Sequence, residues 1–178
     1  MILEKIIILI AIFVSYFLQT SLEFFQLGGI KPDFLLLLTL YYSFYKGEMY
    51  GIWIGFIAGL LQDINLGVMT VAGTNQVRHY IGINILPKAL AGYLSGKFSD
   101  NIQKDSPFSW FIIVFIFSLG KGVVLFILTA IFHGNVAAEM LVTVILPESL
   151  YNALLSLLWF RLLFWIFPPM MYQTRDIR

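Results

Sequence analysis

Long apolar stretches separated by short polar segments dominate the chain. A helix that crosses a bilayer needs about 20 mostly apolar residues, or about 17 at the short end, and the pattern predicts six helices, of which the second is short. Their approximate bounds are 3–25, 32–45, 48–66, 81–98, 107–132 and 138–167. We therefore predict an all-α membrane protein, a six-helix transmembrane bundle that forms a single domain over residues 1–178.

The first and last apolar stretches and the longest polar stretch carry further signals about their structure. No small-x-small cleavage site follows the first stretch, so we expect a retained helix rather than a signal peptide. The last stretch would measure about 48 Å as one helix, which is too long for a hydrocarbon core of about 30 Å. Pro147 is therefore expected to kink this stretch or to begin the true sixth span. The longest polar stretch, 67–80, is expected to be a loop.

The composition supports the membrane assignment and excludes several functional classes. Of 178 residues, 60% are apolar and 12% are charged, whereas soluble domains have about 45–50% and about 25%. A net charge of +1 leaves no basic surface for nucleic acid. The chain has no cysteine, and its two histidines, His79 and His133, lie far apart without metal-ligand spacing. We therefore predict no disulfide, no metal site and no cofactor.

The basic residues indicate how the helices are oriented. Cytoplasmic loops of membrane proteins carry an excess of Lys and Arg. With the N-terminus inside, seven basic residues lie at cytoplasmic ends: Lys5, Lys46, Lys97, Lys104, Arg161, Arg175 and Arg178. Only Lys31 and Arg78 lie on the other side. This asymmetry predicts a multi-pass protein with both termini in the cytoplasm.

Three charged residues are expected deep in the membrane. At 1.5 Å per residue, Asp63, Lys88 and Lys121 lie roughly 18, 15 and 21 Å from the inner ends of their helices. Each costs at least about 2.5 kcal/mol there unless it is paired. No nucleophile–base pair, metal-ligand cluster or phosphate-binding loop accompanies them. We therefore predict a structural ion pair and no enzymatic activity, although Asp63 is the residue that could serve as a general base.

Small residues are spaced so that two helix faces match these charges. Gly51, Gly55, Gly59 and Asp63 recur every four residues, and Lys88, Gly92 and Gly96 repeat the same step. Residues at this spacing share one helix face, and glycines there let helix backbones approach closely. We predict that the two stripes face each other and that Asp63 pairs with Lys88, with Lys121 as the competing partner. The alternative is that the glycines only permit close packing and that each charge occupies a water-filled pocket.

Several stretches, in their order and spacing, resemble the rod shape-determining protein MreD family of bacterial inner-membrane proteins. They are Lys31-Pro32-Asp33, the segment 55–63, the segment from Gly82-Ile83-Asn84 to Gly92-Tyr93-Leu94-Ser95-Gly96, and the segment 146–152. The resemblance implies a non-enzymatic subunit of the cell-elongation complex that binds MreC and helps to organise peptidoglycan synthesis and cell shape. Through MreC it would contact the RodA–penicillin-binding-protein synthase and cytoplasmic MreB filaments. Membrane lipids are the other expected partners.

The resemblance also supplies an alternative function. The fold of the MreD family is similar to that of the substrate-binding subunits of energy-coupling-factor vitamin transporters, so a solute-binding membrane subunit is the second hypothesis. Those subunits dock an ATPase module through an Ala-xxx-Ala patch on the first helix. Ala11 and Ser15 are four residues apart at that place in this chain. A lipid-handling membrane protein is a third reading.

Overall fold

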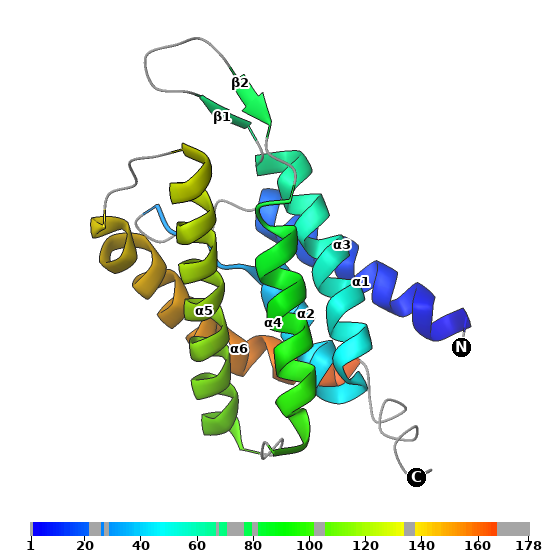
Figure 1. Ribbon diagram of the computed structural model, residues 1–178. Coiled ribbons are helices and arrows are strands. Elements are labelled where there is room, and N and C mark those ends of the chain that lie inside the picture. The colour runs from blue at the N-terminus through cyan, green and yellow to red at the C-terminus, as the bar shows by residue number, and fades with distance from the viewer. Residues whose placement is uncertain are drawn as a thin grey trace.

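The computed structural model describes residues 2–21, 26, 29–66, 68–70, 77–79, 82–101, 106–133 and 138–166. Six α-helices lie in these residues, which confirms the predicted number (Figure 1). They are α1 (Ile2–Ser21), α2 (Phe34–Lys46), α3 (Glu48–Leu66), α4 (Ile85–Phe98), α5 (Pro107–His133) and α6 (Leu146–Ile166). A short 3-10 helix, η2 (Ser99–Asn101), follows α4. Three segments are long and apolar enough to cross a membrane: 4–21 of α1, 107–131 of α5, and 141–166, which includes α6.

The polar stretch 67–80 departs from the expected plain loop. It contains two three-residue strands, β1 (Val68–Thr70) and β2 (Val77–His79), which pair antiparallel with Met69 opposite Arg78. The strands lie between α3 and α4 in the chain and mark one end of the bundle, at the top of Figure 1. We call this end of the bundle the hairpin end.

Helix α2 forms the centre of the bundle. All of its residues from Phe34 to Phe44 are buried, and it contacts each of the other five helices. A helix that is apolar on every side is stable only when other elements cover it completely. At 13 residues it is about 20 Å long, shorter than the hydrocarbon core of about 30 Å. Because α2 is both short and covered, its first residue lies inside the protein.

Local signals set the two ends of α2. Asp33 accepts a hydrogen bond from the Leu36 N–H at 2.9 Å, which caps the first turn. Gly47 has a φ of +93° and donates its N–H to the Ser43 carbonyl at 2.9 Å. A positive φ is strained for other residues, so glycine allows the chain to turn directly into α3.

Two antiparallel helix pairs flank α2. Helices α3 and α4 form the most extensive contact between described elements, and α5 packs mainly on α6. Aromatic rings join the second pair to α2, since Trp110 of α5 lies 5.1 Å from Phe44 and 5.0 Å from Phe160 of α6 between ring centroids. At the end opposite the hairpin end, Lys46 forms an ion pair with Glu4 of α1 at 2.8 Å.

The helix boundaries correct two details of the sequence prediction. The fourth helix begins at Ile85 instead of residue 81, because Gly82 has a φ of +112° and the turn it starts runs to residue 84. The last α-helix begins at Leu146 instead of residue 138, after a π-helical turn, η3 (Leu141–Ile145), that precedes Pro147. Proline has no N–H to donate to the preceding turn, and a wider turn accommodates the missing hydrogen bond.

Candidate functional site

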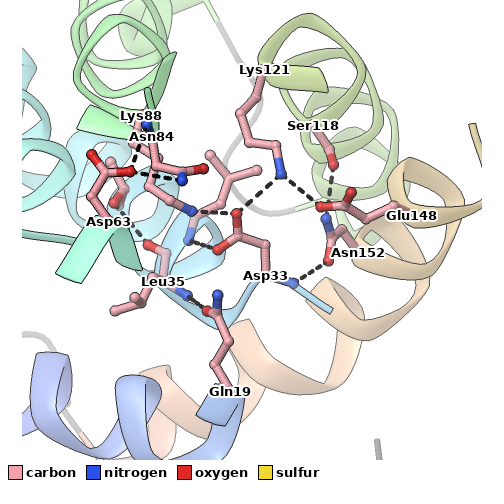
Figure 2. A network of polar contacts seen from close by, with 12 residues as sticks. Gln19, Asp33, Leu35, Asp63, Asn84, Lys88, Ser118, Lys121, Glu148 and Asn152 are labelled. Atoms are coloured by element: carbon pink, nitrogen blue, oxygen red, sulfur yellow. Dashed lines mark hydrogen bonds and ion pairs between the residues drawn. The ribbon is translucent and has the colours of Figure 1, made fainter. Parts of the chain in front are cut away.

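Asp33, at the start of α2, is the centre of a buried network of charged and polar side chains (Figure 2). One carboxylate oxygen, Oδ1, caps α2, while Oδ2 accepts hydrogen bonds from Lys88 of α4 and, at 3.2 Å, from Lys121 of α5. The Asp33 backbone N–H donates to Asn152 of α6 at 2.8 Å. One residue therefore connects α2 to three other helices.

A second carboxylate completes the charge balance of this network. Glu148 accepts from Lys121 at 2.6 Å. The side chains of Lys88, Asp33 and Lys121 are 0%, 3% and 5% exposed, and that of Glu148 is 19% exposed. Removing charges from water is costly, and the cost is offset only when each charge has a close partner of opposite sign. We call Asp33, Lys88, Lys121 and Glu148 the charge cluster.

Uncharged side chains extend the network to the remaining helices. Asn152, fully buried, donates through Nδ2 to Ser118 of α5 at 2.8 Å. Gln19 of α1 accepts from the Leu35 N–H at 3.2 Å. Helices α1, α4, α5 and α6 thus each have a polar contact with the start of α2. The buried polar residue of α3 contacts Asn84 instead.

That residue is Asp63, and its position overturns the predicted ion pair. Asp63 accepts from the Gly82 N–H at 2.8 Å, from the Asn84 N–H at 3.0 Å and from Asn84 Nδ2 at 2.8 Å. Asp63 thus binds the turn that leads into α4, where backbone N–H groups have no partner within the helix. Lys88, one turn further along α4, pairs with Asp33 instead. The predicted Asp63–Lys88 pair is therefore wrong, and so is the competing Asp63–Lys121 pair, since Lys121 also binds Asp33.

The structure does bring the two glycine stripes together. A Cβ atom added to Gly51 would lie 2.2 Å from the Gly92 carbonyl oxygen, and one added to Gly55 would lie 2.5 Å from the Lys88 carbonyl oxygen. The same holds at Gly59, which faces Ile85 of α4. At the other end of the interface, a Cβ on Gly96 would lie 2.4 Å from Glu48 Cα. The backbones of α3 and α4 are thus in direct contact, which only glycine at these positions permits.

Asp33, Glu148 and Asn152 were not among the predicted site residues. The sequence contains two signals that could have found them. A second helix of 13 residues places Asp33 about 20 Å from the helix's other end, in the same layer as the three charges that were predicted to be deep. All three residues also lie in stretches on which the family resemblance rests.

The charges of the cluster are paired with one another inside the protein. Both Asp33 oxygens and both lysines are used in contacts within the protein. In the part of the chain that the structure describes, no group of three or more His, Asp or Glu residues could hold a metal ion. The arrangement fixes helix ends relative to one another, because each charge needs its partner in place.

These features define a helical membrane protein with a polar network inside the bundle. The family model of the rod shape-determining protein MreD matches residues 1–172 of the chain. The chain therefore belongs to the MreD family, a cell-shape family of membrane proteins. Neither a curated protein nor a solved structure matches the chain. The similarity to energy-coupling-factor subunits accordingly remains a prediction from the resemblance.

The structure weakens the residue-level argument for the transporter alternative. Ala11 and Ser15, the counterpart of the ATPase-docking patch, are 5% and 0% exposed. They face the interior of the bundle, where α1 packs on α2. A docking patch has to be accessible to its partner, so this pair does not form one in the conformation described.

Proposed function

We propose that the protein is a non-enzymatic, multi-pass subunit of the bacterial cell-elongation complex that binds MreC in the inner membrane. The observation that carries the proposal is the family match over residues 1–172. Through MreC the protein would contact the RodA–penicillin-binding-protein synthase and cytoplasmic MreB filaments. In this way it would help to organise peptidoglycan synthesis.

The distribution of the described residues supports recognition through helix faces. The exposed side of α1 is apolar, with Leu9, Phe13 and Phe17 each more than half exposed. On α6, Leu158 and Trp165 are 71% and 84% exposed. Surfaces of this kind face lipid or another membrane helix. A single-span partner such as MreC can pack on them through its membrane helix.

Co-purification tests the partner directly. A tagged chain extracted from membranes that contain MreC and an energy-coupling ATPase module is expected to retain MreC and not the ATPase. The control is an unrelated tagged multi-pass protein expressed at the same level. Retention of the ATPase together with a bound vitamin, and no MreC, would instead support the transporter alternative.

The absence of cysteine from the sequence makes the proposed topology easy to check. Single-cysteine variants Gly73→Cys and Gly134→Cys, at positions outside the described residues, are expected to react in intact spheroplasts with a thiol reagent that does not cross membranes. Tags at residues 1 and 178 are expected to be accessible only after lysis. A tag that is accessible before lysis at residue 178 but not at residue 1 would show that the number of spans is odd.

A further inference from the structure

A cavity of about 220 Å³ lies beside the charge cluster. Its wall includes Gln19 of α1, Gln62 of α3, Asn84, Lys121 of α5 and Glu148 of α6. Figure 2 shows four of these side chains, all but Gln62, gathered around Asp33 from different helices. Small-molecule pockets commonly measure about 300–1,000 Å³, so the cavity suits a compact polar group and not a whole lipid.

The cavity wall has hydrogen-bonding capacity that the described protein does not use. Gln62 Oε1 is buried and has no hydrogen-bond partner among the described residues. Glu148 Oε1 accepts from Lys121, and the Glu148 side chain is 19% exposed. Buried polar atoms are nearly always satisfied by protein, water or ligand. The Gln62 amide carbonyl is an acceptor and requires a donor from whatever fills the cavity. The Glu148 carboxylate lies in the same wall and is a second acceptor.

Charge restricts the class of ligand further. The charge cluster contains two carboxylates and two ammonium groups, joined by ion pairs. A ligand with a net charge would find no unpaired counter-charge among the buried residues of the cluster, and desolvating it would be unfavourable. The wall nevertheless presents both signs to the cavity, through Lys121 and Glu148. A zwitterionic group, with one positive and one negative charge, matches such a wall when its cationic end lies against Gln62 Oε1 and Glu148.

We propose that this cavity binds a zwitterionic ammonium–phosphate group, with the ammonium donating to Gln62 Oε1 and Glu148 and the phosphate on the Lys121 side. The same chemistry occurs in the headgroup of phosphatidylethanolamine and in free glycerophosphoethanolamine, both of which are phosphodiesters with no net charge. Lys31, also in the wall and exposed, adds a second cation. The proposal does not depend on MreC binding.

Native mass spectrometry of the delipidated, full-length protein tests this proposal. We expect added phosphatidylethanolamine to be retained and phosphatidylglycerol, which is anionic, to be retained at least about tenfold less. Glycerophosphoethanolamine, a phosphodiester zwitterion without acyl chains, is added as a third probe and distinguishes a headgroup that needs its lipid tail from one that binds as a free solute. Equal retention of both lipids, or retention of neither zwitterion, would overturn the proposal.

Gln62→Leu is the matching variant. It removes the acceptor from the cavity and is expected to weaken retention of the zwitterion about tenfold. Its thermal unfolding temperature should not fall, because the variant also removes an unsatisfied buried oxygen. Gln26→Leu makes the same chemical change at an exposed position away from the cavity wall and should bind as the unaltered chain does. Unchanged retention in Gln62→Leu would contradict the proposed mode of binding.

Discussion

Asp33→Asn is expected to lower the free energy of unfolding by about 3–5 kcal/mol, the usual effect of removing one partner from a buried ion pair. Asparagine caps a helix as well as aspartate does and has nearly the same size, so the first turn of α2 keeps its hydrogen bond. The charge is lost, however, and Lys88, which is fully buried, then has no carboxylate. Lys121 keeps Glu148. The instability should therefore arise chiefly from Lys88.

Denaturant unfolding in detergent micelles measures this effect, and abundance in membranes should fall with it. Glu139→Gln is the control, because it also removes one carboxylate charge but at an exposed position before η3. Surface changes of this kind usually alter stability by less than about 0.5 kcal/mol. If Asp33→Asn were as mild as its control, the charge cluster would not contribute to the stability of the bundle.

Gly51→Ala should be nearly as damaging, although it adds only one methyl group. The new Cβ would lie 2.2 Å from the Gly92 carbonyl oxygen and 2.6 Å from the carbonyl carbon. Both are backbone atoms, so no side-chain rotation can relieve the overlap, and α3 must move away from α4. Overpacking usually costs about 1–3 kcal/mol. We expect a loss near 3 kcal/mol, because the stripe continues at Gly55 and Gly59 and the separation would open those contacts too.

Gly120→Ala provides the matched comparison on α5. A Cβ there would meet no atom within 4 Å, and alanine favours a helix over glycine by about 0.5–1 kcal/mol. The same substitution should therefore be neutral or slightly stabilising at position 120 and strongly destabilising at position 51. Thermal unfolding of both variants in the same detergent gives the comparison. Similar unfolding temperatures for the two variants would show that α3 and α4 are not in backbone contact.

The helices themselves were largely predictable, because hydropathy and helix signals act locally. The predicted bounds 48–66 coincide with α3, and 107–132 differs from α5 by one residue. The facing glycine stripes were also predictable. Their four-residue spacing defines a helix face, and consecutive antiparallel helices are neighbours, so the two faces had an obvious partner in each other.

The partners of the charges could not be read in the same way. The spacing of the glycines with Asp63 and Lys88 indicates which helix face each charge occupies. It does not indicate that the start of α2 lies between α4, α5 and α6. The sequence identifies Asp33 as the residue before a short helix, but it does not identify the side chains that Asp33 contacts. Those contacts follow from the tertiary packing of this short helix, to which five other helices contribute.

Two double-mutant cycles on Lys88 test the central role of Asp33 most directly. One combines Lys88→Met with Asp33→Asn, and the other combines Lys88→Met with Asp63→Asn. Residues in one buried network show interaction energies of about 0.5–3 kcal/mol, whereas independent sites add within about 0.5 kcal/mol. The contacts predict clear coupling of Lys88 to Asp33 and near-additivity with Asp63. Coupling to Asp63 together with additivity for Asp33 would contradict the pairing of Lys88 with Asp33.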